Sequence, residues 1–147
     1  MSKWVTRERP KTDRIACPWL IRNFIDPDAE FLYVEPHEVE RVARESNAIP
    51  FDVEGATLGH VDGRCSFESI LVEYRLDDAA LHRLAAIVHG ADVEADIRLT
   101  PEAAGLKAIA MGFRRLYGDR DLEKLEAQVP MYDALYEWCR HAPSMPV

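Results

Sequence analysis

The sequence predicts an α+β fold with a small N-terminal β-sheet, a crossover helix and a predominantly helical C-terminal half. Short strand-like runs are confined to residues 1–53, whereas apolar residues recur at helical spacing from Ser66 onward. With 147 residues, 48% of them hydrophobic, one core is enough to stabilise the chain. Because no repeat or linker-like stretch interrupts the sequence, residues 1–147 are predicted to form a single domain.

The N-terminal elements are predicted in the order strand, helix, strand. Lys3–Arg7 is a short candidate strand, and Glu30–Val34 is a stronger one because it lies between Asp26–Asp28 and Pro36. The apolar run Pro18–Ile25 between them is typical of a helix. If the two strands are parallel in one sheet, this order favours a right-handed crossover.

A second helix and a third strand follow. Apolar residues at helical spacing predict a helix over His37–Ser46, and alternation predicts a strand over Ile49–Val53. Glycines at positions 55, 59 and 63 then indicate a loop.

The rest of the chain is predicted to be helical, with apolar stripes over 67–74, 81–88 and 106–113 and a last helix over Arg120–Arg140. Asp77 or Asp78 is expected to cap the second of these helices. Thr100-Pro101-Glu102 has the N-cap, proline and early acid of a helix start. Pro130 is expected to bend or split the last helix.

Composition and charge exclude several classes of protein. No apolar run approaches the roughly 18 residues of a membrane-spanning helix, and the charged N-terminus has no secretory signal, so a cytoplasmic location is expected. The net charge of −8 disfavours nucleic acid as a partner. Three widely spaced cysteines match neither a disulfide framework nor a zinc finger.

The charge is distributed unevenly. Residues 1–22 carry six basic and two acidic side chains, although the whole chain is acidic. A local basic patch on an acidic protein suits a small anion better than a long polyanion. A basic strand that pairs with an acidic face of the same fold explains the pattern equally well.

Cys17, Arg14 and Arg22 form the first candidate site. Because Pro18 suits the first helical position, Cys17 is predicted at the N-cap, where the helix dipole and the two arginines would favour a reactive thiolate. The same amides and guanidinium groups could instead bind an oxyanion without reaction at sulfur. The structural alternative is a small cysteine buried under Trp19.

The second candidate site is the loop Leu58–Glu68. His60 lies in a glycine-bracketed loop where it has no obvious packing role, and Cys65 or Ser66 is predicted to cap the following helix. Glu68 lies in the first turn of that helix, where a carboxylate is also simply favourable for the dipole.

His89 and Asp92 lie at the end of an apolar helix that Gly90 is expected to terminate. A histidine at a helix C-terminus has an ordinary electrostatic explanation. Taken with His60 and Glu68, however, the two residues complete a set of nitrogen and oxygen ligands for a divalent metal ion. The sequence does not indicate which metal.

Five segments of the chain together carry a family resemblance, namely Trp4–Arg7, Asp13–Arg22, Gly59–Glu68, Pro101–Leu106 and Tyr132–Tyr136. On these segments the sequence resembles the chromate-resistance family represented by the C-terminal domain of ChrB, from about Lys3 to Arg140. The resemblance implies chromate, a tetrahedral dianion, as the oxyanion, and arginine or free helix-start amides as its ligands.

The role implied by the resemblance is either chromate reduction or chromate sensing. Electrons for reduction would come from Cys17 or Cys65 thiolate, from a bound redox metal or from an external thiol, since no glycine-rich dinucleotide motif is present. Two other classes stay open. One is a non-catalytic sensory or protein-interaction module, and the other is a metal-dependent enzyme that acts on an unrelated small molecule.

Overall fold

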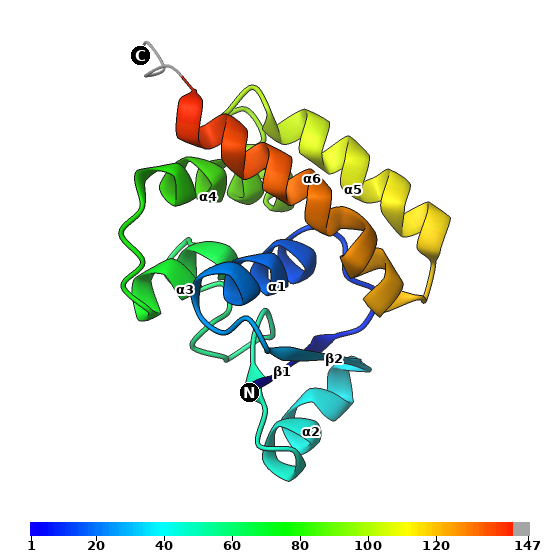
Figure 1. Ribbon diagram of the computed structural model, residues 1–147. Helices are drawn as coiled ribbons and strands as arrows, with labels where there is room; N and C mark the ends of the chain where they lie inside the picture. Colours follow the sequence, from blue (N-terminus) through cyan, green and yellow to red (C-terminus); the bar gives the residue numbers. More distant parts are fainter. Residues whose placement is uncertain (143–147) are drawn as a thin grey trace.

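A small parallel sheet lies at one end of the molecule in the computed structural model, which describes residues 1–142 (Figure 1). Strand β1 (Lys3–Arg7) is central, flanked by β2 (Glu30–Val34) and by the shorter β3 (Ile49–Pro50). Both pairings are parallel. The predicted strand, helix, strand order at the N-terminus is therefore confirmed.

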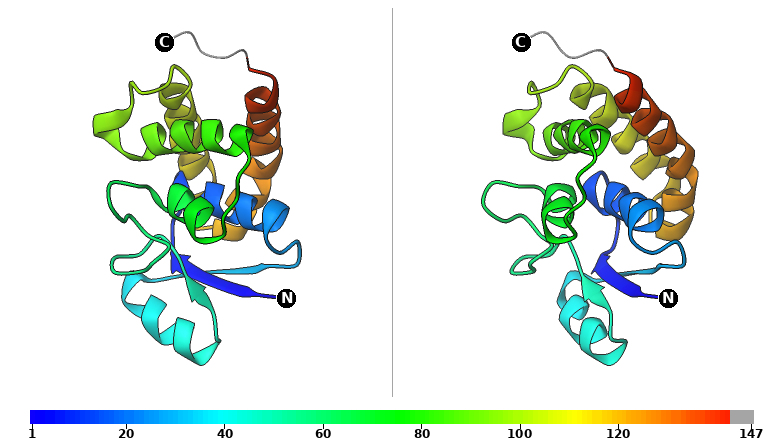
Figure 2. Two further views of the ribbon diagram at one scale, coloured as in Figure 1. Left: turned by 90° about the vertical axis from the view of Figure 1, so that its left-hand side faces the viewer. Right: turned by 60° about the vertical axis from the view of Figure 1, so that its left-hand side comes forward.

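The two faces of the sheet are covered unequally. Helix α1 (Asp13–Phe24) lies on one face with the C-terminal helices beyond it, and α2 (Val39–Glu45) covers the other (Figures 1 and 2). Because side chains alternate along a strand, Trp4 joins the main core while Val5 packs with Val39 in a smaller cluster.

Four helices complete the described chain, namely α3 (Ser66–Glu73), α4 (Ala79–Asp92), α5 (Ala103–Tyr117) and α6 (Asp121–His141), with short 3₁₀ turns η1 (Pro36–Glu38) and η2 (Glu94–Asp96). The predicted α+β class is thus confirmed. Asp78 caps α4 by accepting bonds from the amides of residues 80 and 81, and Cys65 is the N-cap of α3. None of the helices in residues 1–142 is long and apolar enough to cross a membrane.

Helix α1 begins a full turn earlier than the sequence predicts, so the placement of Cys17 at its N-cap is wrong. The N-cap is Thr12, and both Cys17 and Pro18 lie inside the helix. Pro18 has no N–H to donate to the carbonyl of Arg14 four residues before it. The Tyr33 hydroxyl on β2 donates to that carbonyl at 2.6 Å, which satisfies the orphaned acceptor and lets the helix continue.

Three other boundaries differ from the prediction. Strand β3 ends at Pro50, because Asp52 adopts a left-handed backbone conformation with φ +50°. Helix α5 begins at Ala103, so the Thr100-Pro101-Glu102 segment precedes the helix. Pro130 lies inside α6 and does not split it.

Gly90 does not terminate α4, which continues to Asp92. A Cβ at this glycine would lie 2.9 Å from the Cβ of Ala103 and 3.0 Å from the carbonyl oxygen of Asp96. The glycine therefore serves close packing of α4 against the start of α5 and the η2 turn.

Candidate metal and oxyanion site

The four predicted metal ligands lie in two separate clusters. His60 lies with Asp92, and Glu68 lies with His89. The structure therefore does not bring the four residues together around one metal ion, in contrast to the prediction from the sequence. Although His89 and Asp92 are one turn apart on α4, His89 faces Glu68 on α3 while Asp92 faces the loop that carries His60.

The first cluster, called the His60 cluster below, consists of His60, Asp13, Asp52 and Asp92. The Nε2 atom of His60 lies 3.1 Å from Asp92 Oδ2, 3.4 Å from Asp52 Oδ1 and 3.6 Å from Asp13 Oδ2. Ligand atoms of Asp13, His60 and Asp92 all lie within 4.8 Å of one another. One imidazole nitrogen and several carboxylate oxygens so placed are a ligand set for a divalent metal ion such as Mn²⁺.

Asp13 is held by the N-terminus of α3. Its side chain is 1% exposed, and its two oxygens accept hydrogen bonds from the backbone amides of Ser66 at 2.7 Å and Phe67 at 3.0 Å. These amides are the free donors at a helix start, where a carboxylate is also favoured by the dipole. Asp52 is positioned by the Ser66 hydroxyl, which donates to its Oδ1 at 2.7 Å.

Cationic side chains surround the same carboxylates. Asp13, Asp52, His60 and Asp92 line a cavity of about 310 Å³ whose wall also includes Arg7, Lys11, Thr12, Arg14 and Arg114. Arg7 and Arg14 approach Asp52 Oδ2 at 3.3 and 4.0 Å. The cavity therefore offers positive groups to an anion as well as oxygen ligands to a metal.

Two polar atoms of this cavity's residues are buried and lack a hydrogen-bond partner within residues 1–142. They are Nε of Arg14 and the hydroxyl oxygen of Thr12. A buried donor without an acceptor costs about 1–3 kcal/mol, and a ligand in the cavity could supply the acceptor that these two atoms lack.

The proton equilibria of the His60 cluster are strongly displaced. The nearby carboxylates of Asp13 and Asp52 raise the pKa of His60 to about 10, because they favour the protonated imidazole. Burial, reinforced by the neighbouring charges of Asp13 and Asp52, raises the pKa of Asp92 to about 6. Burial also raises the pKa of Asp13. In the absence of a metal ion, a protonated imidazole thus partly neutralises three crowded carboxylates.

The second cluster, called the Cys65 cluster below, consists of Cys65, Glu68, His89 and Asp96. His89 Nδ1 lies 2.6 Å from Glu68 Oε1, and its Nε2 lies 2.6 Å from Asp96 Oδ2. Glu68 Oε1 also accepts the Cys65 backbone amide at 2.9 Å, which completes a capping box on α3.

Cys17 lies beneath the His60 cluster and does not face solvent. It is fully buried, and its Sγ donates to Asp13 Oδ1 at 3.4 Å. Burial and then the charge of Asp13 raise the pKa of the thiol well above its ordinary value. The expectation of a thiolate at a helix N-cap is therefore wrong, because the residue is neither at the helix start nor beside an unpaired cation.

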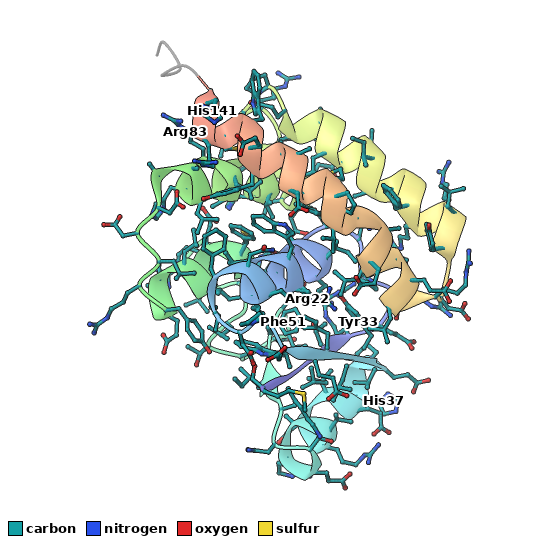
Figure 3. The ribbon with its side chains drawn as sticks, in the orientation of Figure 1. Arg22, Tyr33, His37, Phe51, Arg83 and His141 are labelled. Atoms are coloured by element: carbon teal, nitrogen blue, oxygen red, sulfur yellow. The ribbon has the colours of Figure 1, made fainter. Side chains whose placement is uncertain are left out.

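The two arginines predicted beside Cys17 separate. Arg14 lines the cavity, whereas Arg22 forms an ion pair with Glu126 at 2.7 Å and lies over the Phe31 ring at 5.2 Å. Figure 3 shows Arg22 in the layer between α1 and β2, near Tyr33. Arg22 thus anchors α6 and the sheet, and it lies outside the candidate site.

Sequence reasoning did not assign a role to Asp13, Asp52, Arg7, Lys11, Thr12 or Arg114. Asp13 and Asp52 follow β1 and β3, and polar residues after neighbouring parallel strands meet at one edge of the sheet. The sequence carries that signal for Asp13, whereas Asp52 lies inside the strand predicted over Ile49–Val53 and follows β3 only in the structure. Arg114 reaches the cavity from α5, and no local pattern indicates it.

Comparison with known proteins identifies the family. The sequence-family model described as the ChrB C-terminal domain matches residues 4–139 of this chain. Protein ChrB of Cupriavidus metallidurans is 41% identical over an alignment of 138 residues that covers 91% of this chain and 40% of the relative's length. No solved structure matches. The resemblance found on the sequence motifs is confirmed, and the chain belongs to the family of the ChrB C-terminal domain.

Proposed function

We propose that this chain is a chromate-resistance domain that binds chromate together with a divalent metal ion in the cavity of the His60 cluster. Its role is to bind and report the oxyanion, and it does not reduce chromate with its own thiols. The chain spans 40% of the relative it matches, so the signal would pass to another protein or to a further part of a longer chain.

The observation that carries the proposal is a pair of buried polar atoms without hydrogen-bond partners, which belong to two residues that line the cavity. Arg14 Nε and the Thr12 hydroxyl are buried and make no hydrogen bond within the described chain, although Nε lies 4.0 Å from Asp52 Oδ2, and both residues line the cavity. Both can donate to an anion oxygen. Arg7, Lys11 and Arg114 add positive charge around the same space.

A metal ion makes the acidic side of the cavity compatible with an anion. Asp13, His60 and Asp92 would supply three ligand groups, and a divalent ion in place of the His60 proton would carry more charge to offset the carboxylates. Three protein ligands leave coordination positions to which an oxyanion oxygen can bind. The ion therefore supplies positive charge and an attachment point.

Burial of the thiols favours binding over thiol-based reduction. Cys17, Cys65 and Cys139 are at most 1% exposed, and burial raises the pKa of each thiol. A buried thiol with a raised pKa is a poor nucleophile and a poor electron donor to an oxyanion in solution.

Calorimetric titration of chromate into Mn²⁺-loaded protein tests the proposal. Arg14→Lys keeps the charge but removes the Nε donor, and we expect chromate affinity to fall at least about tenfold, or ~1.4 kcal/mol. Arg22→Lys is the matched control, because Arg22 is on the same helix but contacts Glu126 and Phe31 outside the cavity. Equal effects of the two substitutions would contradict the assignment.

A second candidate function is metal-dependent reduction of chromate by an external reductant, favoured by the open positions that three protein ligands leave on an ion. It is distinguished by following chromate absorbance with ascorbate or dithiothreitol as reductant. The binding proposal expects the same rate with and without protein. Protein-dependent turnover that His60→Gln abolishes would favour the enzyme instead.

A further inference from the structure

We propose that Cys65, Glu68 and His89 bind a second divalent metal ion, of the thiophilic class that includes Zn²⁺ and Co²⁺, separate from the ion of the His60 cluster. One ligand atom from each of the three residues lies within 4.8 Å of the others. Cys65 and Glu68 come from the start of α3, and His89 comes from the last turn of α4.

The donor types select this class of metal. The His60 cluster offers oxygen and one nitrogen, whereas the Cys65 cluster adds sulfur. Thiolate and imidazole together favour zinc and its analogue cobalt over magnesium, calcium or manganese. The two clusters therefore differ in the ions that they prefer.

A cysteine at the N-cap of α3 needs an explanation beyond capping. Serine, threonine, aspartate and asparagine are the favoured N-caps because their oxygens accept strongly, and a thiol is a weak acceptor. Cys65 nevertheless occupies that position, completely buried, with its sulfur directed to the Glu68 amide. Metal ligation gives the sulfur a role that capping does not require.

Asp96 orients His89 for ligation. Histidine ligands commonly donate their second ring nitrogen to a carboxylate, which fixes the tautomer and aims the free lone pair at the ion. His89 Nε2 contacts Asp96 Oδ2 at 2.6 Å, so its Nδ1 is the nitrogen that faces Glu68. The same arrangement is expected around a metal on the Nδ1 side.

Metal binding requires only a small opening of the cluster. Ligand atoms around a tetrahedral zinc ion stand roughly 3.2–3.8 Å apart, whereas Nδ1 and Glu68 Oε1 are 2.6 Å apart. The Glu68 side chain is 29% exposed and can withdraw by rotation. Bonds form from the ion to sulfur, nitrogen and oxygen, while the thiol proton and the Nδ1 proton pass to solvent.

The consequence is structural support for the first site. The ion would join the start of α3 to the end of α4. Ser66 and Phe67, whose amides hold Asp13, follow Cys65 directly, and Asp92 lies one turn beyond His89. A metal in the Cys65 cluster therefore fixes the two segments from which the His60 cluster is built.

Cobalt titration of chelator-treated protein tests the inference, with Co²⁺ alone as the probe. We expect two equivalents to bind and a thiolate-to-cobalt charge-transfer band to appear in the near ultraviolet. Cys65→Ser is expected to lose one equivalent and the band, while Cys17→Ser and Cys139→Ser keep both. A band that survives Cys65→Ser, or no band in the unsubstituted protein, would overturn it.

One further variant distinguishes the two metal sites experimentally. His60→Gln is expected to lose one cobalt equivalent and keep the charge-transfer band, whatever becomes of chromate binding. X-ray absorption of the unsubstituted protein with Zn²⁺ avoids dependence on variant folding. One sulfur at about 2.3 Å from zinc is expected, and a zinc site with only nitrogen and oxygen neighbours would refute the proposal.

Discussion

At the scale of single residues, His60 links protonation to stability. An unfolded histidine loses its proton near pH 6.5, whereas the folded side chain beside Asp13 and Asp52 keeps it to about pH 10. The folded protein thus binds more protons between these values, and the free energy of unfolding of the metal-free protein is expected to fall as pH rises from about 6.5 to 10. The side chain is 49% exposed, so solvent weakens the effect.

Urea unfolding with a chelator, repeated across this pH range, measures the slope. His60→Gln should reduce it. Some slope will persist, because the pKa of His89 is also raised, where the bonds to Asp96 and Glu68 outweigh burial. If His60→Gln left the slope unchanged, the protonated imidazole would have no part in the folded state's charge balance.

Cys17 supports the site from below without taking part in it. The thiol donates to Asp13 from the buried side of α1, and a serine hydroxyl can make the same bond. Cys17→Ser is therefore expected to change the chromate Kd less than about threefold, or ~0.7 kcal/mol. A much larger loss of chromate affinity, measured by the same calorimetric titration, would show that Cys17 takes part in chromate binding.

At the scale of elements, Asp13 joins the first turn of α1 to the N-terminus of α3. Asp13→Ala removes the acceptor for two buried amides, so we expect a loss of about 2–4 kcal/mol in the free energy of unfolding at neutral pH. Asp78→Ala removes the cap of α4 together with the bond that the Tyr136 hydroxyl donates to Asp78, and it serves for comparison, with an expected loss of about 1–2 kcal/mol. Equal losses would show that Asp13 is no more than another cap.

The packing of α4 against α5 depends on the absence of a side chain at Gly90. Gly90→Ala is expected to destabilise the protein by about 1–3 kcal/mol in urea unfolding, because the added methyl meets Ala103 and the Asp96 carbonyl. Gly112→Ala in α5 is the control. Nothing lies within 4 Å of its new methyl, so it should stabilise the helix by up to ~1 kcal/mol.

At the scale of the whole molecule, the His60 cluster gathers residues from distant parts of the chain. A ligand that binds only this folded arrangement stabilises the entire fold by mass action. Mn²⁺ at 100 times its Kd should add about 2.7 kcal/mol to the free energy of unfolding, and His60→Gln should remove most of that gain. Equal stabilisation of the two proteins would place the manganese elsewhere.

Local patterns were sufficient for much of the architecture. The strand, helix, strand order, a cap of α4 at Asp77 or Asp78 and a cap of α3 at Cys65 or Ser66 follow from signals within one element or between neighbours, and the structure selects Asp78 and Cys65. The predicted start of α1, with Cys17 at the N-cap and Pro18 at the first helical position, is wrong for a non-local reason. The hydroxyl that compensates the proline comes from Tyr33 on another strand, and no local pattern contains that information.

The family, the α+β order of elements and the kinds of chemical groups available were determined by the sequence alone, because they depend on composition, periodicity and motif. The tertiary structure decided which groups meet. It placed His60 with Asp13 and Asp92, gave Glu68 and His89 a separate cluster with Cys65, and moved Arg22 out of the site. Such contacts join residues far apart in the chain, so they exist only once the helices have packed around the sheet.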